Sequence, residues 1–168
     1  IVGKDDVVIA FSQSGETADT LEAVETFKKN KAYICSVINM PGSTLSRMSD
    51  IFFMSNAGSE ICVASTKVFT SQISFGYLLA KSLINEYSEA KNELSILSQN
   101  LETFFNEKTF SNIKKISKLL KNKEHFFILG KGQNYHIAQE GALKIKEISY
   151  KHFEGFAAGE LKHGVIAL

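Results

Sequence analysis

The sequence predicts an α/β protein built on a parallel sheet. Two short, almost wholly apolar runs, Val7–Phe11 and Tyr33–Ile38, flank a segment in which Leu21, Val24 and Phe27 recur at helical spacing. Such runs are typical of strands that are buried on both faces of a parallel sheet. A strand–helix–strand unit of this kind implies a right-handed parallel crossover.

The same order of elements occurs again near the end of the sequence. His125–Leu129 is another buried apolar run, and it leads through Gly130-Lys131-Gly132-Gln133 into a helix expected from about Tyr135 to Lys151. Between these two regions, Pro41-Gly42-Ser43 is expected to form a turn. Ile51–Met54 is expected to be a third strand, and a long helix follows it.

Residues 85–123 differ in character, because their apolar residues repeat only at helical spacing. Two amphipathic helices are expected there, with stripes formed by Leu94, Leu97, Leu101 and Phe104 and by Ile113, Ile116, Leu119 and Leu120. We therefore predict two α/β units, residues 1–84 and 124–168, joined by a helical connection over residues 85–123. A single doubly wound domain is the alternative.

Composition excludes several classes of protein. Of the 168 residues 44% are hydrophobic, and this share excludes a disordered chain. The sequence has 19 Lys and Arg residues and 18 Asp and Glu residues, so its net charge is too small to attract nucleic acid or a membrane surface. The apolar stretch Val68–Ile84 contains Ser71, Gln72 and Lys81 and is interpreted as a core helix. Cys35 and Cys62 show no metal-ligand spacing, which favours a reducing, cytoplasmic setting.

The loop Ser12-Gln13-Ser14-Gly15-Glu16-Thr17 is the first candidate site. It lies between a parallel strand and a helix, where open α/β sheets bind ligands and where free backbone N–H groups attract anions. It lacks the lysine and the glycine spacing of a nucleotide-binding P-loop. Ordinary capping of the helix by Thr17 is an equally good interpretation. For Gly130-Lys131-Gly132-Gln133, a simple glycine turn is favoured over a phosphate site.

The helix expected after that second loop carries Glu140, Lys144 and Glu147 within one narrow wedge of its surface. A surface ion pair is the simpler interpretation. The functional alternative is a cation held between two carboxylates that serve in proton transfer. His163, in the glycine-flanked segment Gly159–Gly164, is a further candidate because histidine titrates near neutral pH.

At these same residues the sequence resembles the isomerase part of the glucosamine-6-phosphate synthase family. The resemblance covers essentially the whole chain and is carried by Ser12–Thr20, Gly58–Lys67, Glu140–Tyr150 and Ala158–Gly164. It implies a tandem pair of sugar isomerase (SIS) domains, each a three-layer α/β/α sandwich with a parallel sheet. The sequence, which opens on Ile1 without an initiator Met, would then be a piece running from inside the first domain to inside the second.

The resemblance also implies a reaction and its participants. The family makes glucosamine 6-phosphate from fructose 6-phosphate and ammonia released from glutamine, with no metal or organic cofactor. Its members are homodimers or higher homo-oligomers, carry a glutamine amidotransferase domain upstream, and are not expected to bind nucleic acid or membranes. The family's Schiff-base lysine lies near the C-terminus of the full protein, outside this sequence.

Position by position, the resemblance assigns roles to ten residues. Glu147 would move the proton between C1 and C2 of the sugar, Lys144 would assist at the neighbouring hydroxyl, and Glu140 would orient both. His163 would reach into the site of the partner subunit and help to open the ring of the sugar that is bound there. The sugar phosphate would be held by Ser12, Gln13, Ser14 and Thr17, and the sugar would be lined by Val63 and Ser65.

Two departures and two alternatives accompany these assignments. Val165 replaces the proline that usually follows His-Gly in the family, and Cys62 replaces a glycine. A non-catalytic sugar-phosphate sensor would need the hydroxyl-rich loop but would have no use for Glu140, Lys144 and Glu147. A related deglycase or an aldose–ketose isomerase would keep both sets of residues.

Overall fold

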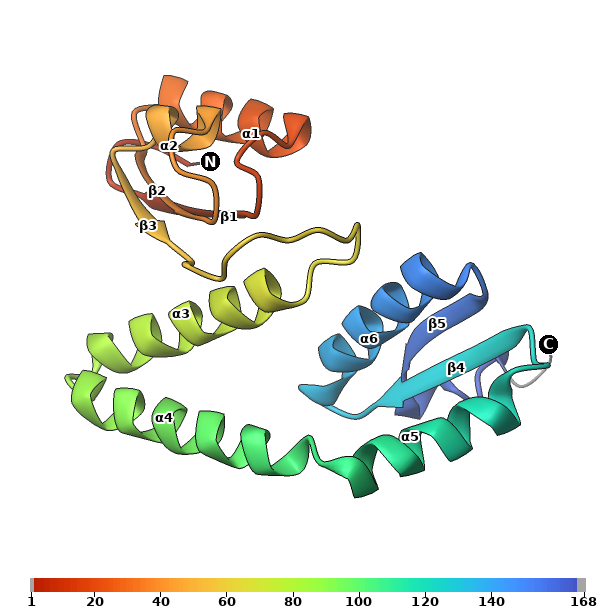
Figure 1. Ribbon diagram of the computed structural model, residues 1–168. Helices are drawn as coiled ribbons and strands as arrows, with labels where there is room; N and C mark the ends of the chain where they lie inside the picture. The colour runs from red at the N-terminus through yellow and green to blue at the C-terminus, as the bar shows by residue number, and fades with distance from the viewer. Residues whose placement is uncertain (1, 166–168) are drawn as a thin grey trace. The chain divides into compact units, whose positions relative to one another are not determined.

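The structure is a computed structural model that describes residues 2–165. The chain divides into two compact units, Ile1–Leu94 and Ser95–Leu168, and each is an α/β unit with its own parallel sheet (Figure 1). The predicted α/β class with parallel strands is therefore confirmed. The sheet of unit 1 has the strand order β1-β2-β3, and that of unit 2 pairs β4 with β5.

Unit 1 contains three strands and the helices that follow them. Its elements are β1 (Val7–Ser12), α1 (Ala18–Lys29), β2 (Tyr33–Ile38), α2 (Thr44–Met48), β3 (Ile51–Met54) and α3 (Lys67–Leu83). The strands are parallel, with Ser12 opposite Ile38 and Ile38 opposite Met54. The carboxyl ends of all three strands therefore meet at one edge of the sheet, where their following loops gather.

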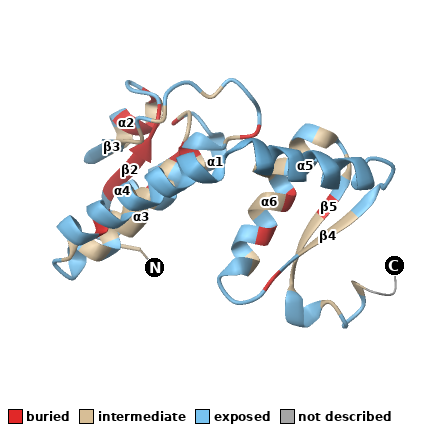
Figure 2. Ribbon diagram, turned by 60° about the horizontal axis from the view of Figure 1, so that its bottom comes forward, coloured by how far each residue is buried: buried red, intermediate tan, exposed pale blue. Residues whose placement is uncertain are grey.

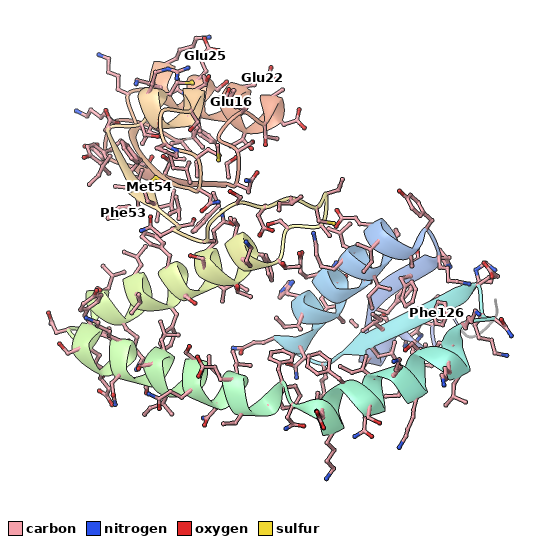
Figure 3. The ribbon with its side chains drawn as sticks, in the orientation of Figure 1. Glu16, Glu22, Glu25, Phe53, Met54 and Phe126 are labelled. Carbon is pink, nitrogen blue, oxygen red and sulfur yellow. The ribbon has the colours of Figure 1, made fainter. Side chains whose placement is uncertain are left out.

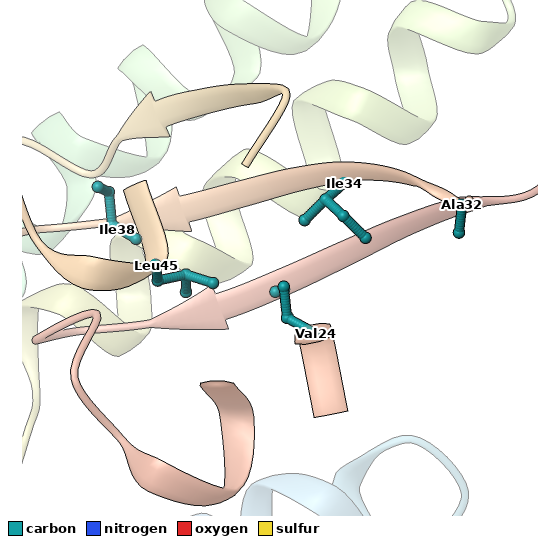
Figure 4. Close-up of a cluster of buried hydrophobic side chains, with 6 residues drawn as sticks. Val24, Ala32, Ile34, Ile38 and Leu45 are labelled. Carbon is teal, nitrogen blue, oxygen red and sulfur yellow. The ribbon is translucent and has the colours of Figure 1, made fainter. Parts of the chain in front are cut away.

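Helices α1 and α2 cover one face of this sheet. Val24 of α1, Ile34 and Ile38 of β2 and Leu45 of α2 are at most 2% exposed and form the centre of the core (Figure 4). Burying side chains of this size contributes about 1.5–3 kcal/mol each. The position of the loops at the carboxyl edge therefore depends on this core.

Helix α3 lies against the opposite face and completes three layers in unit 1. The ring of Phe75 packs 6.2 Å from that of Phe11 and 5.1 Å from that of Phe53. Other apolar side chains of this face remain open, among them Val7 at 65% exposure and Ile9 at 40%. In Figure 2 the buried residues of unit 1 accordingly concentrate in β2 and in the segments that pack on it.

Helix α2 was not expected from the sequence, which predicted only the turn at residues 41–43 before it. Its five residues are too few to show a helical repeat of apolar side chains, so periodicity could not detect it. Ser43 begins it as the N-cap, with its hydroxyl accepting a 3.4 Å hydrogen bond from the N–H of Ser46. The proline and glycine at positions 41 and 42 do form the preceding turn.

The predicted helical region is present as α4 (Tyr87–Phe104) and α5 (Glu107–Leu120). Asn106 separates the two helices and caps α5, because its side-chain oxygen accepts a 3.1 Å hydrogen bond from the N–H of Thr109. Of the residues in α4 only Ala90 is buried, and α5 contains none. In the described part of the chain no helix is long and apolar enough to cross a membrane.

Unit 2 contains β4 (His125–Gly130), α6 (Asn134–Ser149), β5 (His152–Ala157) and a short 3₁₀ helix, η1 (Ala158–Glu160). The sequence interpretation extended α6 to Lys151 and missed β5. The helix ends at Ser149 because Tyr150 adopts a left-handed conformation with φ of 57°. His152, Glu154 and Gly155 interrupt the apolar pattern of β5.

Two glycines allow α6 to approach the sheet of unit 2. A Cβ atom at Gly155 in β5 would lie 2.5 Å from the Cα of Gln139, and one at Gly130 would lie 2.0 Å from the carbonyl oxygen of Asn134. Contacts this short do not occur, so both positions require glycine. Ala138 and Ala142 complete the buried face of α6. These small residues position the helix that carries Glu140, Lys144 and Glu147.

Candidate functional site

The loop of residues 12–17 follows β1 and leads into the N-terminus of α1, as predicted. Ser12 is 7% exposed, and its hydroxyl accepts a 2.9 Å hydrogen bond from the N–H of Gly15. Gly15 has φ of 68°, and its carbonyl accepts a 3.0 Å bond from the N–H of Leu45 in α2. A Cβ there would lie 2.2 Å from the Oγ of Ser43. The loop is therefore closed on itself and fixed to α2.

The hydroxyl groups of this loop keep donors for a ligand. Ser12 and Ser14 accept hydrogen bonds from the N–H groups of Gly15 and Glu16, and each hydroxyl still has its own hydrogen to donate. Thr17 occupies the N-cap position of α1, yet its side chain makes no capping hydrogen bond. The structure therefore does not support the interpretation that the Thr17 side chain simply caps α1. Three hydroxyls at a helix N-terminus suit an anion such as a phosphate.

Glu16 has a structural role that the sequence interpretation missed. Its Oε1 accepts a 2.7 Å hydrogen bond from the N–H of Thr44, the first residue of α2. This backbone hydrogen bond, with smaller contributions from the side chain of Thr44 and from the charge of Arg47, lowers the pKa of Glu16 below its usual value. Figure 3 shows Glu16 beside α1 and α2 in unit 1 (Figure 3). The only signal in the sequence was a carboxylate within a loop of hydroxyl residues.

A second loop, residues 55–66, connects β3 to α3 and contains Val63 and Ser65. The side chain of Asn39, just after β2, supports its beginning by donating to the carbonyl of Gly58 at 2.7 Å and accepting from the N–H of Ala57 at 3.0 Å. A cavity of about 350 Å³ lies there, lined by Asn39, Met40, Met54, Asn56, Gly58 and Ser59. Val63 is 88% exposed. The cavity and the 12–17 loop share the carboxyl edge of the sheet.

In unit 2, α6 brings Glu140, Lys144 and Glu147 together as predicted. The ammonium of Lys144 lies 2.8 Å from Oε2 of Glu147 and 3.6 Å from Oε1 of Glu140. The three side chains are only 20–26% exposed, so this is a half-buried cluster and not a solvated surface pair. Burial lowers the pKa of Lys144, but the hydrogen bond and charge of Glu147, together with Glu140, outweigh it and raise that pKa. Lys144 therefore stays protonated at neutral pH.

His163 lies in the turn that follows η1, and its side chain is exposed. Its backbone N–H donates a 2.9 Å hydrogen bond to the carbonyl of Glu160. The ten predicted site residues thus form two sets. Six lie at the end of β1 or in the loops of unit 1, and the other four lie in unit 2. Among residues 2–165 no group of three or more His, Cys, Asp or Glu side chains is arranged to hold a metal ion.

Comparison with known protein families supplies the classification. The SIS domain family matches residues 1–82 and 119–168, which together make up more than half of the chain. The chain belongs to the SIS domain family. The two matched segments of this SIS chain carry the hydroxyl-rich loop and the Glu140–Lys144–Glu147 cluster, respectively.

Individual relatives share a name. The SIS chain is 43% identical to the "Glutamine--fructose-6-phosphate aminotransferase [isomerizing]" of Streptococcus pneumoniae over 100% of its own length and 29% of that protein. It is 46% identical to the protein of the same name from Thermotoga maritima, over 97% of its own length and 28% of that protein. The chain therefore spans less than a third of these relatives.

Solved structures agree with the fold. The C-terminal domain of a glucosamine-fructose-6-phosphate aminotransferase from Francisella tularensis superposes with a TM-score of 0.79 at 42% identity, over 96% of this chain and 47% of that one. A glucosamine-6-phosphate deaminase from Thermotoga maritima gives a TM-score of 0.79 at 26% identity, over 100% of this chain and 50% of that one. The SIS chain thus has the fold of enzymes that are named for amino-sugar phosphates.

Proposed function

We propose that this SIS chain is the isomerase part of a glutamine–fructose-6-phosphate aminotransferase. The observation that carries the proposal is the half-buried cation of Lys144 between the carboxylates of Glu147 and Glu140. A sensor that only binds a sugar phosphate has no need of such a set. The shared name of relatives that are 43% and 46% identical supports the same reaction.

The phosphate of fructose 6-phosphate binds in the 12–17 loop. Ser12, Ser14 and Thr17 donate from their hydroxyls, Gln13 donates from its side-chain amide, and the N-terminus of α1 adds unpaired N–H groups. Val63 and Ser65 of the second loop line the sugar. Support for this arrangement comes from the common edge of the sheet at which both loops end.

The chemical step moves a proton from C1 to C2 of the 2-imine sugar, and the proton of the C1 hydroxyl passes to the imine nitrogen, which yields the 2-amino aldose. A single base that reaches both carbons from one face can take the proton and return it. Glu147 is that base, because the family resemblance puts it nearest the sugar and Lys144 lies one helical turn before it. Lys144, held in the protonated form, donates to the neighbouring sugar hydroxyl. Glu140 keeps the lysine in place from its other side.

The remaining parts of the assignment concern ring opening and assembly. His163 opens the sugar ring in the site of a partner subunit, so the working protein is a homodimer or a larger homo-oligomer. Residues 1–84 and 124–168 belong to two SIS domains joined by residues 85–123, and a glutamine amidotransferase domain precedes them. The reaction uses no cofactor. The free thiols of Cys35 and Cys62 suit the cytoplasm.

The decisive test is Glu147→Gln in the complete protein, with Glu140→Gln as the matched control. The amide keeps the size of the side chain but removes the base. Affinity for fructose 6-phosphate should stay within about tenfold, or about 1.4 kcal/mol. Product formation should fall by about 10²–10⁴-fold, as is typical when a general base is lost.

Exchange of the sugar C1 proton with solvent deuterium tests the assignment of the base and separates this proposal from a non-catalytic sensor. Glu147→Gln should abolish the exchange, whereas Glu140→Gln should only slow it. A Glu147→Gln protein that exchanges the proton at the wild-type rate would show that Glu147 is not the base. A wild-type protein that binds the sugar phosphate but neither exchanges its proton nor forms product would instead be a sensor.

A further inference from the structure

The loop that carries Val63 and Ser65 is closed by a carboxylate. Glu60 reaches forward along the chain, and its Oε1 accepts hydrogen bonds from the N–H of Thr66 at 3.2 Å and from the N–H of Val68 at 2.9 Å. These two bonds lower the pKa of Glu60 below its usual value, because they stabilise the ionised carboxylate. Glu60 therefore satisfies backbone donors at the start of α3.

Helix α3 does not cap itself. Thr66 is its N-cap residue, with φ of −125° and ψ of −57°, and the threonine side chain makes no capping hydrogen bond. The free N–H groups of a helix N-terminus need such an acceptor. Since Glu60 supplies it from six residues upstream, the intervening residues are forced into a closed loop. The cap of the helix and the shape of the loop thus depend on one side chain.

Two further contacts fix the same loop. The ammonium of Lys67 donates a 2.7 Å hydrogen bond back to the carbonyl of Ser59, across the base of the loop. Ala64, in the middle of this loop, is buried, with 5% of its surface exposed. Ile61 and Val63, at 97% and 88% exposure, point away from the unit. The loop presents side chains outward while its ends are held by Glu60 and Lys67.

We propose that Glu60 is a positioning residue, which holds Val63 and Ser65 in place for the sugar by capping α3. The proposal rests on the proposed function, because it assumes that these two residues line the sugar. Glu60 itself does not contact substrate. Its effect passes through the N–H groups of Thr66 and Val68, and any side-chain oxygen of the right length can make the same bonds.

The test compares Glu60→Ala with Glu60→Gln in the complete protein, with Glu22→Ala as a control for the loss of an exposed carboxylate from unit 1. Two quantities are measured: the Kd for fructose 6-phosphate, and the rate of hydrogen exchange at the N–H groups of Thr66 and Val68. Loss of a helix cap should raise both in Glu60→Ala, by about tenfold. The amide oxygen of Glu60→Gln should restore both to within about threefold of wild type.

Each other outcome overturns part of the argument. If Glu60→Gln raises the Kd as much as Glu60→Ala while the N–H groups of Thr66 and Val68 exchange at the wild-type rate, the charge acts without the cap, and positioning through the cap is wrong. If Glu60→Ala accelerates exchange but leaves the Kd unchanged, Glu60 is structural only. A wild-type protein that fails to bind fructose 6-phosphate overturns the proposed function instead. The wild-type measurement alone reveals that result.

Discussion

The carboxylate of Glu16 accepts a 2.7 Å hydrogen bond from the backbone N–H of Thr44, and so joins the proposed phosphate loop to the start of α2. The acceptor lies within the loop, and the donor belongs to a helix that is anchored in the core by Leu45. Together with the bond from the N–H of Leu45 to the carbonyl of Gly15, it couples the hydroxyl groups of the loop to the buried core of unit 1.

Thr44→Pro should loosen this loop. Proline lacks the N–H that Glu16 needs, and position 44 is the first residue of α2, where proline is well tolerated. Ser43 already has the extended conformation required before proline, with ψ of 163°. We expect the Kd for fructose 6-phosphate to rise by about 3–10-fold. Thr44→Ala keeps the N–H and should bind like wild type; equal weakening in both variants would implicate the hydroxyl instead.

The same bond predicts how the carboxyl of Glu16 titrates. Its pKa is lowered from 4.5, so the stabilisation is fully present above about pH 4.5 and is lost as the pH falls through the lowered value. An NMR titration should place the midpoint of Glu16 below 4.5 in the wild type and closer to 4.5 in Thr44→Pro. A wild-type midpoint at or above 4.5 would contradict the hydrogen bond.

Ser14→Ala should discriminate between phosphorylated and unphosphorylated sugars. The variant removes one hydroxyl donor to the phosphate, and a hydrogen bond to a charged group contributes about 1.5–3 kcal/mol. We therefore expect the Kd for fructose 6-phosphate to rise by at least about tenfold, while weak binding of fructose stays unchanged. Calorimetry with both sugars measures the difference. An equal loss for the two sugars would place the phosphate elsewhere.

Gly155→Ala should weaken unit 2. The new Cβ would lie 2.5 Å from the Cα of Gln139, so α6 must move away from β5, at a cost of about 1–3 kcal/mol. Gly141→Ala is the matched control on α6, because nothing lies within 4 Å of its added Cβ and alanine is favoured in a helix by about 0.5–1 kcal/mol. Thermal unfolding should therefore shift in opposite directions for the two variants. A Gly155→Ala protein of wild-type stability would show that the approach of α6 to β5 is looser than the structure indicates.

Mixing two inactive variants should restore activity if His163 serves a neighbouring subunit. His163→Ala and Glu147→Gln should each be inactive alone. In a mixed dimer, one site then combines an intact Glu147 with an intact His163 and should regain up to about half of the activity of a wild-type site pair, given the independent-site behaviour expected of separate pockets. No recovery in verified mixed dimers would place His163 in the site of its own subunit or outside the reaction.

The sequence was informative where side-chain periodicity or a dense cluster of functional groups reports structure directly. The apolar runs Val7–Phe11 and Tyr33–Ile38 predicted β1 and β2, although β1 is buried on one face only and not on both as expected. Glu140, Lys144 and Glu147 converge because one helix fixes their spacing. These features are local. They follow from residues that are close together along the chain.

What the sequence could not predict depends on partners distant along the chain. Strand β5 pairs with β4, but its polar residues break the apolar pattern from which a strand could have been predicted. The acceptor role of Glu16 depends on Thr44, 28 residues away. The acceptor role of Glu60 depends on the N–H groups of Thr66 and Val68, and these donors could be identified only from the geometry of the loop.

The open apolar face of the unit 1 sheet affects how this chain behaves in solution. Strand β1 hydrogen-bonds to β2 along one edge, and Val7 and Ile9 project from it with 65% and 40% of their surfaces exposed. An edge strand with exposed apolar side chains on one face is a template for self-association. The 168-residue chain, produced alone, should therefore aggregate at micromolar concentrations. An Ile9→Lys substitution should suppress the resulting light scattering, because a charge on that face opposes stacking of identical copies.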